Sequence, residues 1–186
     1  MLMKRSILAF FCIVLSVAVV SARAQVSPAA HGSGFTLNAG ALGSSFQPDY
    51  EGSGVAHSSP QHLYGVGAYV DANFSRWVQI EAEGRWLHFN QFLGVDENTY
   101  MIGPRLAPYT FHKITPYGKL LFGWGSGSFL SGRSFAFAYG GGADYQLTRR
   151  FMVRGDFEYQ QWQVTPITLH PYGFSAGISY RIFPWR

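Results

Sequence analysis

Histidine and serine, the residue types that most often supply enzyme chemistry, stand side by side at one point of this 186-residue sequence. His57 and Ser58 are adjacent, in a segment rich in glycine and serine. A serine nucleophile needs a base within hydrogen-bond reach and a third group that orients the base. A flexible segment of this composition holds such groups poorly. We therefore expect no catalytic residues here and no enzyme.

Metal binding is the second chemistry that these histidines suggest. His57 and His62 share their segment with Asp49 and Glu51. Their spacing matches no established ligand pattern of a zinc site. Nucleotide-binding signatures are also missing, because Gly140-Gly-Gly142 opens no predicted helix. The sequence predicts no metal site and no cofactor.

Charged residues with a regular spacing are more informative. From Trp77 to Trp86 the chain alternates between apolar and polar residues, with Glu81, Glu83 and Arg85 all in the polar set. Successive side chains leave a β-strand on opposite sides, so the alternation predicts a half-buried strand. It does not tell which face meets water. A soluble sheet shows its charges to solvent, whereas a membrane barrel turns them inward.

Eight alternating runs follow one another along the chain, and none beyond the N-terminal segment has helical periodicity. Each is about as long as a tilted strand that crosses a bilayer. The predicted strands are approximately 34–46, 63–72, 77–89, 99–108, 114–124, 135–147, 151–161 and 172–183. Short connections follow the second, fourth and sixth runs, and longer ones follow the others. This asymmetry is typical of an outer-membrane barrel whose short turns face the periplasm.

The N-terminus reads as a secretory signal peptide. Lys4 and Arg5 precede an apolar run over 7–20, and Ala22-Arg23-Ala24 offers a cleavage site. The run is shorter than the roughly 17 to 25 residues of a membrane-spanning helix, which argues against an anchor. We expect Sec-type export, removal of residues 1–24 and a single domain over 25–186.

Removing that segment changes the charge and the thiol content. Of the 14 Lys and Arg residues, Lys4, Arg5 and Arg23 precede the cleavage position, so the rest nearly balances the 10 acidic residues. A balanced chain gives little support to nucleic-acid binding. The only cysteine, Cys12, also lies in the segment. The mature chain is expected to have no disulfide and no nucleic-acid partner.

The polar face of the runs is best explained as an interior. It combines many glycines with six acidic and five basic residues, and a narrow eight-stranded barrel has little room for side chains inside. The remaining acidic residues, Asp49, Glu51, Asp96 and Glu97, are predicted to lie in the long loops. Charged residues make up only 13% of the chain, about half the usual share of a soluble domain. An exported soluble barrel of the lipocalin type remains the alternative.

Aromatic residues near the run ends are expected to form girdles at the two membrane interfaces. The girdle residues are Trp77, Tyr100, Trp124, Phe135, Tyr159, Trp162, Tyr172 and Phe183.

The last run resembles the C-terminal strand of outer-membrane β-barrels, which the barrel assembly machinery recognises. Gly177, Tyr180, Ile182 and Phe183 match that pattern, although the chain continues through Pro184-Trp-Arg186. The stretches over 100–105 and 115–123 are similar to the middle of small OmpA-like barrels. The resemblance covers essentially the whole mature chain. It implies an all-β fold, an eight-stranded antiparallel up-and-down transmembrane β-barrel.

The resemblance also implies an interior closed by ion pairs. The candidates are Glu81, Glu83, Arg85, Arg105, Lys119, Arg154, Asp156, Glu158 and Arg181. Burying a charge costs several kcal/mol unless partners compensate it, so opposite signs are expected to meet. We expect a polar plug, with a gate or narrow ion path as the alternative.

Function follows from these expectations. Lipid A deacylases resemble this chain in size and strand count, but their His-x-Ser-Asn sequence is missing. We expect a monomer in the bacterial outer membrane, with outer-membrane lipid and the assembly machinery as partners. We expect the protein either to have a structural role or to recognise an unknown surface ligand through its long loops. The largest of these loops extends from Gln47 to Gln61. A narrow channel and a lipid A-modifying enzyme are the alternatives.

Overall fold

A computed structural model describes residues 35–48, 62–75, 77–90, 96–128, 132–164 and 167–183. The expected signal peptide and nearly all of the segment from Gln47 to Gln61 lie outside these residues, as do His31 and His57. Within the described part of the chain, no helix is both long and apolar enough to cross a membrane.

The described residues form strands connected by turns. The strands are β1 (Thr36–Gln47), β2 (Leu63–Asn73), β3 (Val78–Phe89), β4 (Glu97–Leu106), β5 (Ile114–Gly127), β6 (Arg133–Gln146), β7 (Phe151–Val164), β8 (Ile167–Leu169) and β9 (Tyr172–Phe183). Eight of them match the eight runs predicted from alternation. The additional β8 is short and pairs only with the end of β7. Pro171 has no N–H to donate and lies between β8 and β9, which explains the break.

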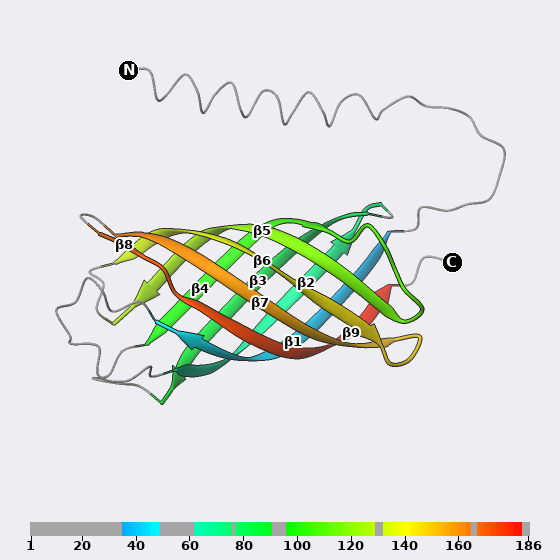
Figure 1. The fold of residues 1–186 in the computed structure, drawn as a ribbon, viewed down its shortest axis with the longest axis horizontal. Helices are drawn as coiled ribbons and strands as arrows, with labels where there is room; N and C mark the ends of the chain where they lie inside the picture. The colour runs from blue at the N-terminus through cyan, green and yellow to red at the C-terminus, as the bar shows by residue number, and fades with distance from the viewer. Residues whose placement is uncertain are drawn as a thin grey trace, which may run out of the picture. The chain divides into compact units, whose positions relative to one another are not determined.

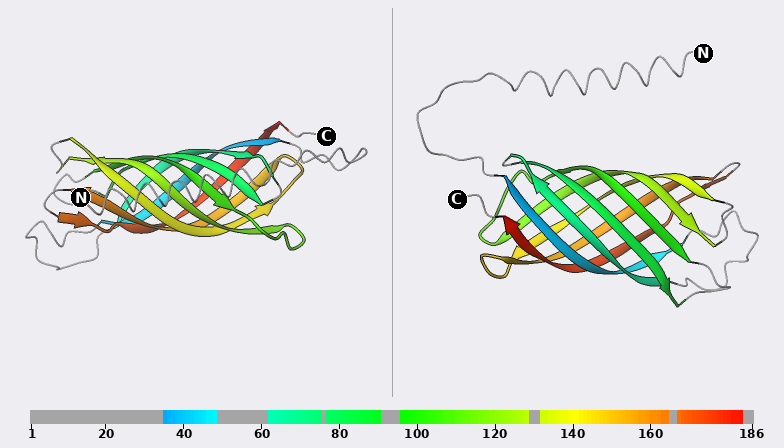
Figure 2. Two further views of the ribbon diagram at one scale, coloured as in Figure 1. Left: turned by 90° about the horizontal axis from the view of Figure 1, so that it is seen from above. Right: turned by 180° about the vertical axis from the view of Figure 1, so that it is seen from behind.

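The eight long strands close into an antiparallel barrel (Figures 1 and 2). Each strand pairs with its neighbour in the chain, and β1 pairs with β9 from Leu37 to Gln47, which completes the ring. The short turns β2–β3, β4–β5 and β6–β7 lie at one end of the barrel, together with the start of β1 and the end of β9. We call this end the short-turn rim and the opposite end the long-loop rim. The predicted fold class is confirmed.

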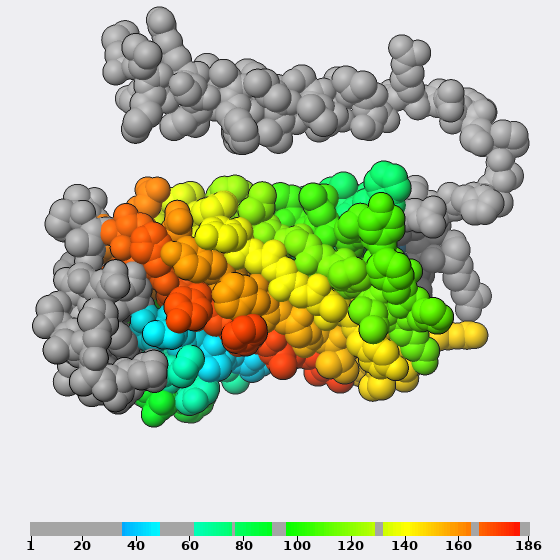
Figure 3. Space-filling view, in the orientation of Figure 1, coloured from blue at the N-terminus to red at the C-terminus, as the bar shows by residue number. Residues whose placement is uncertain are grey.

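The barrel wall is apolar outside and charged inside. Ile80, Ile102 and Phe122 are exposed on the outer surface, whereas Glu81 and Lys119, one residue away from Ile80 and Leu120, are fully buried. A continuous layer of side chains covers the wall on the face seen in Figure 3. The alternation therefore runs opposite to that of a soluble sheet. The charged set of each strand lines the interior.

Two predicted positions are wrong. Glu97 was expected in a long loop, but it begins β4 and is buried, in phase with the inward residues Thr99 and Met101. Trp162 was expected in an outer girdle, but its exposed fraction is 0% and it points into the barrel, in phase with Glu158. Both errors arise near strand ends, where a short window of alternation defines the face weakly. Exposed aromatics at both rims do include the predicted Trp77, Tyr100, Trp124, Phe135 and Tyr172.

Candidate functional site: the plugged interior

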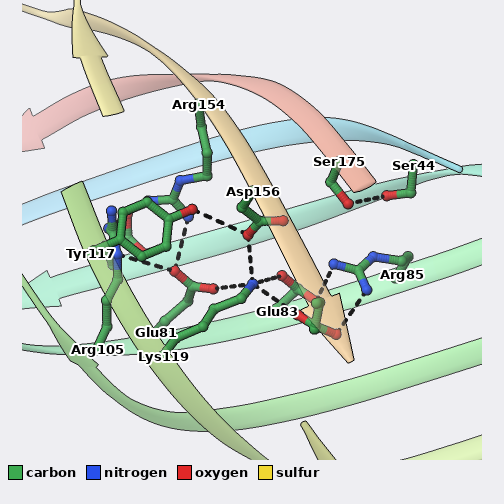
Figure 4. A network of polar contacts seen from close by, with 12 residues as sticks. Ser44, Glu81, Glu83, Arg85, Arg105, Tyr117, Lys119, Arg154, Asp156 and Ser175 are labelled. Carbon is green, nitrogen blue, oxygen red and sulfur yellow. Dashed lines mark hydrogen bonds and ion pairs between the residues drawn. The ribbon is translucent and has the colours of Figure 1, made fainter. Parts of the chain in front are cut away.

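Lys119 is the centre of the first group of interior charges. It extends from β5 across the barrel, and its Nζ lies between carboxylates of β3 and β7 (Figure 4). Nζ lies 3.0 Å from Glu81, 3.1 Å from Glu83, 2.7 Å from Asp156 and 2.9 Å from Glu158. An ammonium group has three N–H donors and no acceptor, so a ring of carboxylates suits it. Lys119 thereby ties together strands on opposite sides of the barrel.

The same carboxylates could hold a metal ion only in place of Lys119. Oxygens of Glu81, Glu83 and Asp156 lie within 4.8 Å of one another, which is close enough to share a cation. Lys119 Nζ already contacts all three residues. The ammonium therefore supplies the positive charge that a metal would otherwise bring.

Arg85 extends this group toward the long-loop rim. Its Nη1 donates to Glu158 at 3.0 Å, and its Nη2 lies 2.7 Å from Glu83. The guanidinium carbon also lies 4.4 Å from the centre of the Phe46 ring, within the range of a cation–π contact. Arg85 thus joins the charged interior to apolar side chains beyond it.

Arg105 and Arg154 form a second group, nearer the short-turn rim. Arg154 donates to Asp144 and Glu81, both at 2.9 Å, and lies 2.5 Å from Asp71. Arg105 donates to Asp71 at 3.0 Å and also pairs with Asp144. Because Glu81 contacts Arg154 as well as Lys119, the two groups form one network across the barrel.

Two tyrosine rings flank the paired arginines. The guanidinium carbon of Arg105 lies 3.6 Å from the centre of the Tyr117 ring, and that of Arg154 lies 3.9 Å from Tyr69. Tyr117 also donates its hydroxyl to Asp156 at 3.2 Å. The rings fill space beside the charges and contribute cation–π attraction in a region away from water.

Glycines make room for these large side chains. Lys119 pairs across the sheet with Gly140, and Arg154 pairs with Gly177. A Cβ added at Gly140 would meet backbone of the adjacent strand β7, whereas one added at Gly40 would lie 2.5 Å from the Tyr69 ring that fills the interior. The repeated glycines of the polar face therefore let the wall come close to the interior side chains, as the sequence predicts for a narrow barrel.

The long-loop half of the interior contains two apolar clusters, which the sequence reading missed, beside buried polar residues such as Thr99 and Gln160. The clusters are Met101, Leu121, Ala136, Ala138, Trp162 and Leu169 in one, and Phe46, Leu63 and Leu87 in the other. All lie on the strand halves nearest the long-loop rim. A Cβ at Gly125 would meet the Trp162 ring at 2.7 Å, so this glycine accommodates the indole. We call these residues the apolar layer.

Hydrogen bonds connect the apolar layer to the charges below it. Trp162 donates its indole N–H to Gln160 at 2.7 Å, and Gln160 donates its amide to Glu158 at 2.6 Å. Glu158 in turn accepts from Arg85. The indole nitrogen, which needs a partner when buried, is thereby satisfied.

Most of the interior residues selected from the sequence meet in the network. Eight of the nine candidates form ion pairs with one another, with Asp71 or with Asp144. Arg181 does not: it is half-buried near the short-turn rim, and its Nη2 lies 3.9 Å from Met152 Sδ. Asp71 and Asp144 were absent from the candidate list although both belong to the inward polar set. Their positions in the alternation, on the same face as the other charged residues, could have added them to the candidate list.

The residues that resemble an assembly signal lie in β9. Tyr180 and Ile182 are exposed on the outer surface, whereas a Cβ at Gly177 would meet Leu42 of β1 inside the barrel. Phe183 ends the strand and pairs with Leu37.

An apolar exterior, a closed ring of strands and a buried charge network define a transmembrane β-barrel. The sequence matches, over residues 12–181, the family described as outer membrane protein beta-barrel domain. The chain belongs to this family, which places it in the bacterial outer membrane. A comparison with curated protein sequences gave no significant match.

Solved structures with the same fold include three bacterial outer-membrane barrels. Neisserial surface protein A (NspA) is 17% identical, with a TM-score of 0.53 over 81% of this chain and 99% of that chain. OprG of Pseudomonas aeruginosa is 11% identical, with a TM-score of 0.53 over 83% and 98%. The N-terminal barrel domain of OprF from the same species is 15% identical, with a TM-score of 0.52 over 79% and 97%. Identities this low show a shared fold.

Proposed function

We propose that this protein is a closed, non-catalytic barrel that serves the envelope as a structural element and recognises surface ligands through its long loops. One observation carries the proposal: buried side chains occupy the interior at two successive levels. The charge network occupies the middle and the short-turn half, and the apolar layer lies in the long-loop half. An ion would have to pass both.

The two barriers oppose ions for different reasons. Crossing the network requires separating buried pairs such as Lys119 and Asp156, 2.7 Å apart, and leaving one partner uncompensated costs several kcal/mol. The apolar layer offers a passing ion no replacement for its water shell, which is a large penalty in an environment of low dielectric. A narrow channel would need both barriers to move together.

Planar-bilayer conductance tests this proposal. We expect the purified protein to give no defined conductance steps, and Trp162→Ala or Lys119→Ala alone to stay closed because each leaves one barrier intact. Combining the two substitutions should produce salt-dependent openings. Trp124→Ala, which removes an indole from the outer surface, is the matched control and should stay closed. Defined steps from the unaltered protein would support the channel instead.

Hydrogen bonds between strand ends at the long-loop rim support the recognition role. His88 Nε2 lies 2.7 Å from Asn98 Oδ1, and the Ser128 backbone N–H donates to Asp96 at 2.7 Å. Tyr172 donates its hydroxyl to Gln47 at 2.6 Å, where the longest loop begins. Loops carried on a braced rim are favourable places for binding sites.

The absence of catalysis is part of the proposal. His88 engages Asn98, and His112 lies in a turn at the opposite rim from His62 and His170. A nucleophile and its base must lie within hydrogen-bond reach of each other, so His112 cannot act together with a histidine of the long-loop rim. Mass spectrometry of lipid A from a deletion strain should give an unchanged profile, and a changed acyl composition would contradict the proposal.

Biogenesis completes the proposal. We expect Sec-type export with cleavage after Ala24, insertion by the barrel assembly machinery through β9, and a monomer in the membrane. The outward Tyr180 and Ile182 support recognition of β9. N-terminal sequencing of the protein from outer membranes should begin at Gln25, and retention of the leader would contradict the cleavage.

A further inference from the structure

The short-turn rim carries a group of exposed bases on neighbouring strands. Lys113 lies in the β4–β5 turn, and Arg149 and Arg150 lie in the β6–β7 turn. The two turns are adjacent, because Gln146, just before the second turn, donates its backbone N–H to the Lys113 carbonyl at 2.8 Å. Figures 1 and 2 show these turns, green and gold, at the same end of the barrel. We call Lys113, Arg149 and Arg150 the basic collar.

Arg150 is held on the outer surface of the barrel. Its Nη1 donates to the Tyr180 hydroxyl at 2.7 Å, and its guanidinium carbon lies 6.0 Å from the centre of that ring. The Tyr180 ring packs edge-on against Phe151, with centroids 5.3 Å apart. The guanidinium therefore lies beside aromatic side chains that belong at a membrane interface.

Exposed apolar residues surround the collar. Tyr109 is 67% exposed, Phe111 63% and Leu147 53%, all in or next to the same two turns. Such residues face acyl chains and the boundary with the headgroups when the barrel is in a bilayer. The bases at their side are then at the level of the lipid phosphates.

Among the described residues of this rim, no carboxylate neutralises the charge of the collar. The described stretches at this rim, 73–75, 77–78, 106–114, 145–151 and 181–183, contain no Asp or Glu. At the long-loop rim the described residues include Asp96 and Glu97, and Arg133 is the exposed base there. Among the described residues, the uncompensated exposed bases are therefore concentrated at the short-turn rim, and a field of one sign attracts the opposite charge.

We propose that the basic collar binds the phosphate groups of anionic phospholipids in the leaflet next to the periplasm. Lys113, Arg149 and Arg150 supply the charge, Tyr180 orients Arg150, and Tyr109, Phe111 and Leu147 contact the acyl chains. A zwitterionic lipid carries its own ammonium, so it gains less from three neighbouring bases than phosphatidylglycerol does. The proposal rests on the orientation with short turns in the periplasm, and it is independent of whether the interior conducts.

The probe is phosphatidylglycerol mixed with phosphatidylcholine. The full-length mature protein is reconstituted in bilayers of known composition and released, and the retained lipids are counted by native mass spectrometry. We expect enrichment of phosphatidylglycerol over its bulk fraction. Each base removed should lower that preference roughly five-fold at low salt, in the series K113Q, R149Q and R150Q. Added salt should reduce the preference because it screens exposed charge.

The matched control is R133Q, which removes an exposed base from the long-loop rim. It should retain the unaltered preference, since both rims contact the same lipid mixture in these bilayers. Folding of every variant is checked by the shift in gel mobility on heating. Equal enrichment in the triple variant K113Q/R149Q/R150Q, equal loss in R133Q, or no enrichment in the unaltered protein would each overturn the proposal. This measurement does not depend on conductance, so a failure of the lipid proposal would not contradict the proposal of a closed interior.

Discussion

At the scale of single residues, Lys119 is the position on which the charge network most depends. It is the shared cation of four carboxylates, so its removal leaves Asp156 without an ion pair and leaves the other three carboxylates with their arginine partners alone. We expect Lys119→Met to lower the free energy of unfolding by about 3–5 kcal/mol. Lys113→Met, at an exposed turn, should change it by less than about 0.5 kcal/mol. Urea unfolding in detergent micelles measures both, and a similar small effect at the two positions would contradict this role.

Individual partners were only partly predictable from the sequence. Alternation placed Arg85 and Glu158 on the inward face because the side-chain period of a strand is fixed. It could not pair them, since they lie on β3 and β7 and meet only when the barrel closes. Trp162 was assigned to the wrong face because an aromatic near a strand end suits both a girdle and an apolar layer. Which apolar residues fill a lumen depends on strand stagger, which a local pattern does not contain.

At the scale of elements, the β4–β5 turn offers a test of backbone strain. His112 has a φ of 55° and, with Lys113, links the paired residues Phe111 and Ile114. A left-handed residue other than glycine costs roughly 1–2 kcal/mol, whereas glycine elsewhere loses about 0.5–1 kcal/mol through its flexibility. His112→Gly should therefore preserve or raise stability, and Lys113→Gly should lower it by about 0.5–1 kcal/mol. Equal losses in urea unfolding would show that the turn is unstrained.

The strands themselves were largely predictable, and the reason is physical. A wall between lipid and a narrow lumen imposes alternation over its whole height, so each of the eight long strands left a clear pattern. The pattern weakens where the wall ends. Glu97 was assigned to a loop because a single inward-facing residue before Thr99 is too short a pattern to show that the strand continues. The short β8 was not predicted because its three residues are too few to show alternation and Pro171 separates them from β9.

At the scale of the whole molecule, the interior and the rims differ from end to end. The charge network occupies the middle and the short-turn half and the basic collar the short-turn rim, while the apolar layer and the carboxylates Asp96 and Glu97 belong to the long-loop half. In a barrel built this way the apolar layer lies beneath the loops that would meet external ligands. Among the described residues, most of its exposed bases lie at the opposite membrane interface. The proposed plug and the proposed lipid contact thus both follow from the different distribution of charged and apolar residues at the two ends of the barrel.

The last prediction tests whether the apolar outer face of the barrel contacts lipid. Ile102 lies in the middle of β4 on the outer face and is 56% exposed, while Tyr109 lies at the short-turn rim. In phospholipid vesicles, Ile102→Arg should lower the free energy of unfolding by about 2–4 kcal/mol, and Tyr109→Arg by about 0–1 kcal/mol, because the cost of a lipid-facing charge depends on depth. Tryptophan fluorescence during urea unfolding reports both. If Ile102→Arg were no costlier than Tyr109→Arg, water rather than lipid would have to surround the barrel wall at β4.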